Sequence, residues 1–141
     1  MTSQQHPNHA KARAYGARFK AEGISHLING ESVPSSSGNT FENITPIDNT
    51  PLCRVARGDA SDIDAAAQAA KAAFPAWRKT SAVERKRLIH AVADLVEEHA
   101  EEIALLETYD TGQTIKFMSK AAERAAGNFR FFADRAESAQ D

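Results

Sequence analysis

Apolar residues follow two different spacings along the chain, and the change between them divides it into an extended part and a helical part. Between Ser25 and Ala56 they come in short runs broken by glycine, proline and asparagine, which is typical of strands and turns. From Gly58 onward they recur every three or four positions, which indicates amphipathic helices. The pattern predicts short strands followed by three or four helices.

In the extended part, the dipeptide Asn29-Gly30 stands between two short apolar runs and predicts a β-hairpin. The segment Pro34–Thr40 has the composition of a turn-rich loop. Two further short strands are expected in FENI and LCRVA, with Pro46 and Pro51 between them. Because proline cannot donate a ladder hydrogen bond, these are expected to be edge strands.

The first helix of the helical part is expected to begin at Asp59 or Ser61, since both can cap a helix N-terminus. Pro75 is expected to end it. The predicted buried face is rich in alanine, which indicates close approach to a neighbouring element. Its members are Ile63, Ala66, Ala67, Ala70 and Phe74.

A longer helical stretch begins at the capping box SAVE, in which Ser81 accepts from the third amide and Glu84 reaches back. The acidic run EEHAEE predicts a break between two helices, and Gly112 predicts a left-handed helix end. A last helix covers AAERAAGNFRFFADRAES, and its phenylalanines are expected in the core. The predicted apolar stripe of the longer stretch comprises Leu88, Val92, Leu95, Val96, Ile103 and Leu106.

Composition and charge are those of a globular protein and narrow the classes of partner. The chain has 141 residues, of which 42% are apolar and 26% charged, with a net charge of −2. This balance gives no reason to expect nucleic acid or a membrane as partner, and no apolar run reaches the roughly 20 residues that span a bilayer. The single cysteine fits a reducing compartment, and we expect a cytoplasmic protein. Residues 1–24 are expected to form a flexible polar extension, with a transit peptide as the alternative.

Candidate catalytic side chains do not combine into a recognisable site. Cys53 lies in a predicted strand, where its neighbour Arg54 faces the opposite side, and a packing role is expected. The five histidines lack metal-ligand spacing, and the glutamates of EEHAEE read as a solvated helix face. No phosphate-binding glycine motif occurs. From the residues alone, the chain is an α+β or α/β piece with no catalytic residue and no cofactor-binding residue of its own.

Five segments in order, however, resemble the N-terminal part of the NAD(P)-dependent aldehyde dehydrogenase superfamily. They are HLINGE, SSSGNTFENITP, LCRVARGDASDIDAAAQAAKAAFPAW, ERKRLIHAVADLVEEHAEEIALLETYDTGQTI and NFRFFADRAE. The resemblance covers about Ser25 to Glu137. The segments NFRFFA and HLINGE are also similar to the semialdehyde dehydrogenases of aromatic-compound catabolism, such as 5-carboxymethyl-2-hydroxymuconate semialdehyde dehydrogenase.

The resemblance implies a truncated α/β fold in which residues 25–141 form part of the cofactor-binding domain and the core parallel sheet is missing. Family enzymes oxidise an aldehyde to a carboxylic acid with NAD or NADP, through a cysteine nucleophile and a glutamate base, and form homo-oligomers. Those catalytic residues and the cofactor loops lie beyond this chain in the family. The implied protein is therefore an oxidoreductase fragment that is inactive alone and exposes an apolar surface for the missing sheet.

One family site is implied in part. Some relatives hold a monovalent cation with backbone oxygens and a carboxylate, and the matching positions are Asn43, Ile44 and Asp110. The alternative for Asp110 is that it caps a helix end. The turn TPIDNTP departs from the usual family sequence, so Asp48 or Asn49 must supply any positive φ.

Two other classes of function stay open. The chain is alternatively a non-enzymatic helical interaction module, which a stoichiometric partner would reveal. A small metal- or cofactor-binding helical protein is the third reading, disfavoured by the scattered histidines.

Overall fold

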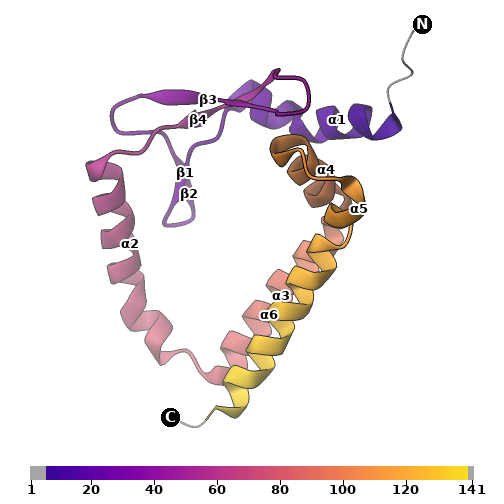
Figure 1. The fold of residues 1–141 in the computed structure, drawn as a ribbon. Coiled ribbons are helices and arrows are strands. Elements are labelled where there is room, and N and C mark those ends of the chain that lie inside the picture. Colours follow the sequence, from indigo (N-terminus) through magenta and orange to yellow (C-terminus); the bar gives the residue numbers. More distant parts are fainter. Residues whose placement is uncertain (1–5, 140–141) are drawn as a thin grey trace, which may run out of the picture. The chain divides into compact units, whose positions relative to one another are not determined.

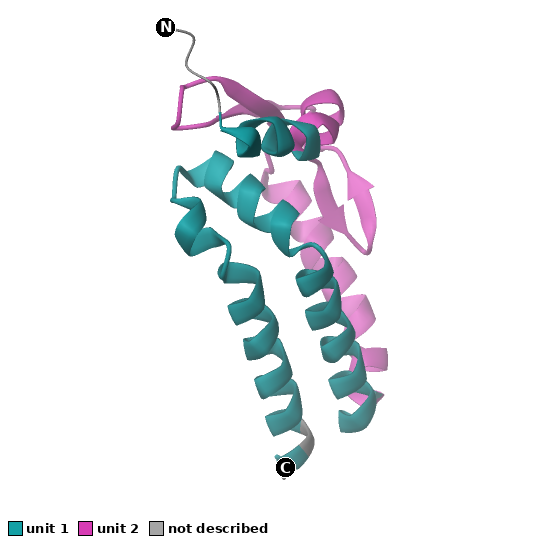
Figure 2. Ribbon diagram, turned by 90° about the vertical axis from the view of Figure 1, so that its right-hand side faces the viewer, with its two compact units in different colours: residues 1–15, 80–141 teal, residues 16–79 magenta. Residues whose placement is uncertain are grey.

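A computed structural model describes residues 6–139 of the chain, which form two compact units (Figure 2). Unit 1 comprises residues 1–15 and 80–141, and unit 2 comprises residues 16–79. Figure 1 labels the elements in chain order: α1 (Pro7–Glu22), β1 (His26–Ile28), β2 (Glu31–Val33), β3 (Thr40–Ile44), β4 (Pro51–Ala56), α2 (Ala60–Lys79), α3 (Ala82–Glu98), α4 (Ala100–Thr111), α5 (Ile115–Met118) and α6 (Ala121–Ser138). Within residues 6–139, the short strands are followed by helices as predicted, but by five helices rather than three or four, and α1 precedes the strands.

The predicted hairpin is present in unit 2, where β1 and β2 pair antiparallel and Ile28 lies opposite Glu31. The connecting residues Asn29 and Gly30 have φ angles of 55° and 80°. Positive φ at both central positions defines a type I′ turn, whose twist matches that of the strands it joins. Asparagine and glycine tolerate this conformation better than other residues, which is why the dipeptide predicted the turn correctly.

A second antiparallel pair joins β3 to β4, with an irregularity in register between Asn43 and Ile44. In the connecting turn, Asn49 adopts a φ of 59°, so it is Asn49 rather than Asp48 that takes the positive φ. A short parallel bridge adds Ile24 beside Val55 on the other edge of β4. Each predicted strand is therefore present, in sheets of two strands.

The segment that enters this sheet turns at Gly23, whose φ is 75°. A Cβ placed there would lie 3.0 Å from the carbonyl oxygen of Arg54, so the position favours glycine both for its φ and for its space. Directly afterwards, the amide of Ile24 donates to the same Arg54 oxygen at 2.8 Å. The glycine thus lets the chain approach β4 closely enough to form the bridge.

Helix α2 continues through Pro75, so the expectation that this proline ends the helix is wrong. Proline lacks the N–H that would bond the carbonyl of Lys71, one turn earlier. Lys71 is exposed, so water can solvate that carbonyl. The residues after Pro75 keep their own amides, and the helix extends to Lys79.

Unit 1 begins its helical part at the predicted cap, where Ser81 Oγ accepts from the amide of Glu84 at 3.2 Å. Only this half of the capping box is confirmed, since the Glu84 carboxylate pairs with Arg87 at 2.7 Å instead. The predicted break falls at His99, between α3 and α4. Gly112 ends α4 with a φ of 74°, and its amide donates to the carbonyl of Thr108. Both predicted boundaries are confirmed.

Helices α3 and α6 pack against each other along a seam of alanines. Ala93 of α3 and Ala126 of α6 are fully buried, and Ala122 and Ala133 of α6 are nearly so. The two helices run antiparallel, because ion pairs link later residues of α6 to earlier residues of α3. Small side chains let the two backbones approach closely.

The polar segment 1–24 contains a helix, α1, over Pro7–Glu22, and the expected flexibility of this segment stays a prediction. Its alanines and long basic residues have high helix propensity, which the charge-based reading overlooked. In unit 1, Lys11 and the hydroxyl of Tyr15 both donate to the carboxylate of Glu101, and Ala12 is 3% exposed. Residues 1–5 lie outside the described part of the chain.

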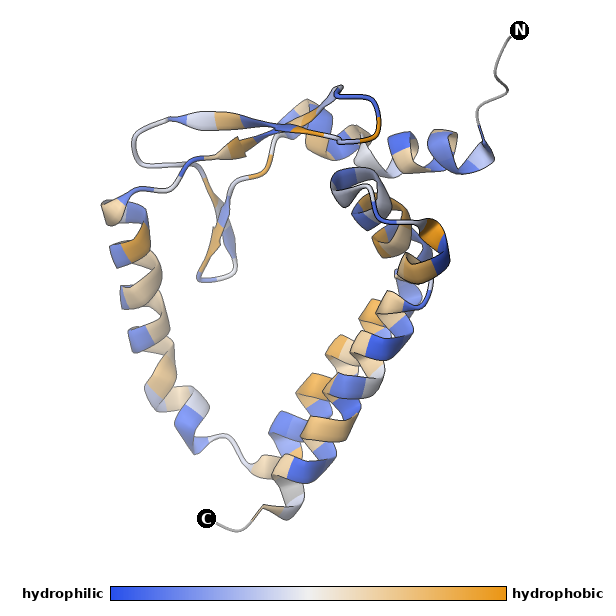
Figure 3. Ribbon diagram, viewed as in Figure 1, coloured by the Kyte–Doolittle hydropathy of each residue, from blue (hydrophilic) through white to orange (hydrophobic). Residues whose placement is uncertain are grey.

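Large apolar side chains are exposed on several helices, and Figure 3 shows hydrophobic positions along α2, α3 and α6. The expectation that the α6 phenylalanines lie in the core is wrong, since their exposed fractions range from 41% to 67%, and Trp77 of α2 is exposed by 44%. The prediction of a buried face on α2 is wrong as well, because all five of its members are exposed, Ile63 by 70% and Phe74 by 58%. Among the described residues, no helix is both long and apolar enough to cross a membrane.

Candidate functional site

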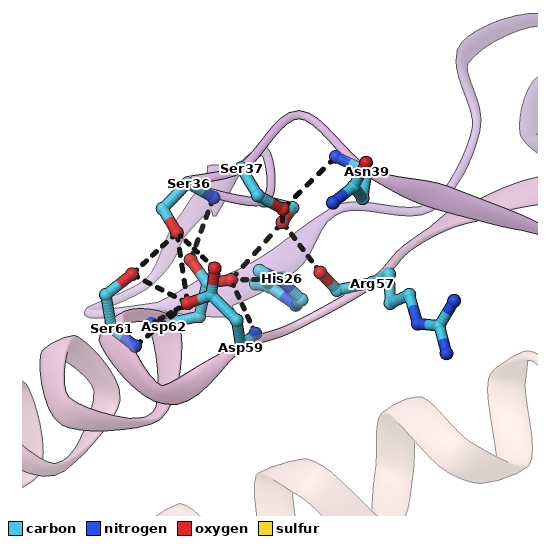
Figure 4. Close-up of polar contacts among 9 residues, drawn as sticks. His26, Ser36, Ser37, Asn39, Arg57, Asp59, Ser61 and Asp62 are labelled. Atoms are coloured by element: carbon cyan, nitrogen blue, oxygen red, sulfur yellow. Dashed lines mark hydrogen bonds and ion pairs between the residues drawn. The ribbon is translucent and has the colours of Figure 1, made fainter.

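Polar side chains from a loop and from the start of α2 meet in unit 2 (Figure 4). We call Ser35, Ser36, Asp59, Ser61 and Asp62 the Ser–Asp cluster. Asp62 lies at its centre and is only 7% exposed. Its carboxylate accepts from the amide of Asp59 at 3.0 Å and from the amide of Ser36 at 3.0 Å. The loop is therefore bonded to the helix through one buried carboxylate.

These amides stabilise the charged form of the carboxylate. The Asp59 amide first, and the Ser36 amide next, hold the pKa of Asp62 below its ordinary value despite burial. The hydroxyl of Ser35 lies 3.3 Å from Asp62 Oδ2 and 2.6 Å from the carbonyl oxygen of Arg57. Its single proton can serve only one of the two acceptors at a time.

Asp59 caps the N-terminus of α2. The sequence had offered Asp59 or Ser61 for this role. Its Oδ1 accepts from the amide of Ser61 at 2.8 Å, and the hydroxyl of Ser61 adds a bond of 2.7 Å. The Ser61 hydroxyl is the main cause of a lowered pKa at Asp59. Since Asp62 in turn accepts from the Asp59 amide, Asp59 and Asp62 form a reciprocal capping box. The Asp-x-x-Asp spacing in GDASD was the signal that could have predicted it.

His26 of β1 borders the Ser–Asp cluster. Its Nε2 lies 3.5 Å from Asp62 Oδ2 and forms no hydrogen bond. Gly58 packs beside the ring, where an added Cβ would lie 3.3 Å from the His26 Cε1 atom. The two Asp62 oxygens are bonded by the chain's own amides, so the cluster joins three segments of unit 2. Its geometry is that of a structural site.

The three predicted cation ligands fall in different units. Asn43 and Ile44 lie on β3 in unit 2, where the strand register shifts between them. Asp110 is exposed in the last turn of α4, in unit 1. Within residues 6–139, no group of three or more His, Cys, Asp or Glu side chains could hold a metal ion. The proposed ligand set of Asn43, Ile44 and Asp110 stays a prediction.

Cys53 lies on β4 opposite Asn43 and is 8% exposed. A nucleophilic thiol must reach its substrate and needs a setting that favours the thiolate. Burial in a two-stranded sheet fits the expected packing role.

The histidines have more acidic partners than the sequence indicated. His90 Nε2 of α3 lies 2.9 Å from Asp134 Oδ1 of α6, and His99 Nδ1 lies 3.3 Å from Glu102. The His90 contact is the main cause of a lowered pKa at Asp134. Spacing within one segment could not reveal the His90–Asp134 pair, because the two residues come from different helices, whereas His99 and Glu102 are three residues apart in the sequence.

A second ion-paired group lies farther along the same helices. Arg130 of α6 donates through Nη1 to Glu97 at 2.7 Å and through Nη2 to Asp94 at 2.7 Å. Arg130 lowers the pKa of Glu97, and the two carboxylates raise the pKa of Arg130. Part of the predicted solvated acidic face thus holds α3 to α6.

Sequence relatives agree on one family. The aldehyde dehydrogenase family matches residues 32–141. The NADP/NAD-dependent aldehyde dehydrogenase PuuC of Escherichia coli K12 is 45% identical over 92 residues, which cover 64% of this chain and 19% of PuuC. The EPTC-inducible aldehyde dehydrogenase of Rhodococcus erythropolis is 39% identical over 135 residues, which cover 94% of this chain and 26% of that enzyme.

Solved structures agree as well. HpcC from Thermus thermophilus superposes with a TM-score of 0.89 at 41% identity, over 94% of this chain and 26% of HpcC. PnpE in complex with nicotinamide adenine dinucleotide superposes with a TM-score of 0.81 at 37% identity, over 83% of this chain and 24% of PnpE. The chain thus spans between a fifth and about a quarter of the length of these proteins. From the family match and the shared architecture, it follows that the chain belongs to the aldehyde dehydrogenase family.

Proposed function

We propose that this chain supplies the N-terminal scaffold of an NAD(P)-dependent dehydrogenase that oxidises an aldehyde to a carboxylic acid. The observation that carries the proposal is the superposition on HpcC, which extends over 94% of this chain but only 26% of HpcC. The reaction then belongs to an assembled enzyme of which these residues are one part.

The chain's own residues support a scaffold role. The one thiol, Cys53, is buried on a strand, and the buried carboxylate Asp62 is bonded to backbone amides. The sequence contains no G-x-G-x-x-G or Walker motif with which to bind a dinucleotide phosphate. NAD(P) would supply hydride acceptance in the assembled enzyme, held by residues outside this chain. We assign no reaction step to the residues present.

A finer proposal concerns the substrate. We infer a semialdehyde from the breakdown of aromatic compounds, because NFRFFA and HLINGE are similar to that subgroup. The support is the sequence resemblance, and it does not extend to any contact with the substrate.

The test is an assay of the purified chain with NAD⁺ or NADP⁺ and a panel of aldehydes, following formation of the reduced nicotinamide. We expect no turnover from this chain, and turnover from full-length E. coli PuuC as the positive control. A Cys53→Ala variant serves as a further control. Turnover by the chain alone that Cys53→Ala abolishes would refute the scaffold role.

The second candidate is a non-enzymatic interaction module. The exposed large apolar side chains of α3 and α6 in unit 1 favour it, because exposed apolar surface commonly marks an interface. The two candidates differ in the partner they require: the scaffold requires the rest of a dehydrogenase, and the module requires an unrelated protein.

A further inference from the structure

The tip of the β1–β2 hairpin places an asparagine directly before a glycine. Asn29 and Gly30 are the central residues of the turn, and both are exposed. In a two-residue hairpin the ladder hydrogen bonds join the residues that flank the turn, here Ile28 and Glu31, so the amide of Gly30 stands outside the ladder. Apart from its chain neighbours, a Cβ added at Gly30 would meet no heavy atom within 4 Å. The amide that follows Asn29 is therefore unhindered.

These two residues can react with each other without an enzyme. The backbone nitrogen of Gly30 attacks the side-chain amide carbon Cγ of Asn29, and the new C–N bond closes a succinimide ring. The bond from Cγ to Nδ2 breaks, and ammonia leaves with the proton that the backbone nitrogen gives up. Water then opens the ring at either carbonyl, which leaves aspartate or isoaspartate at position 29. Glycine favours the attack because it has no Cβ to crowd the nitrogen.

The native turn holds the reacting atoms apart. Asn29 has a φ of 55°, and the first central residue of a type I′ turn has a ψ of about +30°. At this ψ, Cβ of Asn29 and the nitrogen of Gly30 lie on nearly opposite sides of the bond between Cα and the carbonyl carbon, so Cγ cannot reach the nitrogen. Ring closure requires rotation about that bond, which the paired strands oppose. The turn must therefore open before the reaction can occur.

Opening of this hairpin requires few bonds to break. Strands β1 and β2 have three residues each and pair in a sheet of two strands. A hairpin of this size is at best marginally stable on its own in water. Local opening therefore costs less free energy than unfolding of the whole unit, and it frees the ψ angle of Asn29.

We propose that Asn29 is a site of spontaneous deamidation, which the β1–β2 hairpin slows but does not prevent. The proposal concerns a covalent modification and is independent of the proposed aldehyde oxidation. Aspartate at this position keeps the turn, since Asp-Gly also favours type I′, and adds a negative charge. Isoaspartate carries an extra methylene in the main chain, so the turn no longer brings Ile28 opposite Glu31.

A second asparagine provides an internal comparison. Asn49 is also exposed and has a φ of 59°, close to the 55° of Asn29. The residue after it is Thr50, whose β-branched side chain crowds the backbone nitrogen and whose amide donates to Asp48 Oδ1 at 3.1 Å. The sign and size of φ are thus matched, whereas the attacking nitrogen is hindered and already bonded. Deamidation is therefore expected at Asn29 and not at Asn49.

The test is incubation of the purified chain in mildly alkaline buffer, followed by mass spectrometry of peptides. Digestion after glutamate separates the two sites, because Glu31 and Glu42 lie between Asn29 and Asn49. A sample digested before incubation corrects for modification during digestion, and protein isoaspartyl methyltransferase with a labelled methyl donor counts isoaspartate independently. We expect modification at Asn29 to be faster than at Asn49 by about tenfold or more. Equal rates, or an unmodified Asn29, overturn the proposal.

A variant and a denatured sample sharpen the result. Asn29→Gly removes the reactive side chain and leaves a Gly-Gly turn, which also adopts type I′. It should abolish the methyl label of the hairpin peptide, and label that persists overturns the assignment to Asn29. The original chain unfolded in urea should modify Asn29 faster than the folded chain does, because ψ is then free. A rate that unfolding leaves unchanged or lowers overturns the proposal, because the hairpin would then not slow the reaction.

Discussion

The two units hold themselves together by opposite means. In unit 2, a buried carboxylate, Asp62, bonds a loop amide and a helix amide. In unit 1, the packed helices α3 and α6 bury alanines, among them Ala93 and Ala126, and the charged residues stay at the exposed edge. The comparison teaches that unit 2 depends on hydrogen-bonding capacity and unit 1 on side-chain volume. Each dependence can be tested by a substitution that should matter little in the other unit.

The largest effect is expected from Asp62→Ala. It leaves the amides of Asp59 and Ser36 without their acceptor in a buried site, which should lower the melting temperature by on the order of 10 °C. Thermal unfolding followed by circular dichroism measures the change. Asp64→Ala, an exposed carboxylate on the same helix, is the control. Equal shifts in melting temperature for the two variants would show that the buried hydrogen bonds of Asp62 add no stability beyond that of an exposed carboxylate.

Next comes Ala126→Leu, which adds three carbons at a fully buried position of the alanine seam. Overpacking should displace the elements packed around Ala126 and lower the free energy of unfolding by about 1–3 kcal/mol. Denaturant titration provides the measurement. The same substitution at the exposed Ala136 should change it by less than about 0.5 kcal/mol. A tolerated Ala126→Leu would mean that the seam is not closely packed.

A smaller effect is expected at the start of α3. Ser81→Ala removes the acceptor for the Glu84 amide and should cost about 1 kcal/mol. Ser81→Asp keeps an acceptor and should restore most of that stability, as measured by denaturant titration. Loss in both variants alike would indicate that the hydroxyl acts through something other than the cap.

The smallest expected effect is the contribution of Arg130 to stability at low pH. Arg130 makes the folded pKa of Glu97 lower than its unfolded value, so the stabilisation is full above the unfolded pKa and is lost as pH falls through the folded one. We expect the melting temperature to fall below about pH 4.5, and Arg130→Met to make this fall shallower. At pH 7 the variant should lose only a little stability, and salt should shrink the difference. A steeper fall in the variant would contradict the assignment.

Local chemistry explains which features could be predicted. Asn29-Gly30, Ser81 and Gly112 act through their own backbone conformation or a hydrogen bond within one turn, so a few letters of sequence are enough. The aldehyde dehydrogenase resemblance likewise agrees with the match over residues 32–141. Features that a few neighbouring residues determine can therefore be predicted directly from the sequence.

Other features depend on residues of a different element, or on several opposing energies at once, and the sequence did not predict them. Pro75 was expected to end α2, but the loss of one backbone hydrogen bond in an exposed helix does not stop it. The stripe containing Leu95 was read correctly as apolar, but periodicity does not tell which apolar side is covered. The pairing of His90 with Asp134 requires the packing of two helices, which no local pattern contains.

The antiparallel α3–α6 pair also has a consequence for the order of events during translation. Its ion pairs link residues 97 and 130, and residues 90 and 134, so every partner is present once residue 138 has left the ribosome. These sequence separations of 33 and 44 residues exceed those of the β1–β2 and β3–β4 pairings, so the strand pairs are expected to form first. The α3–α6 pair can therefore close during translation, once the strand pairs have formed and α6 has been synthesised.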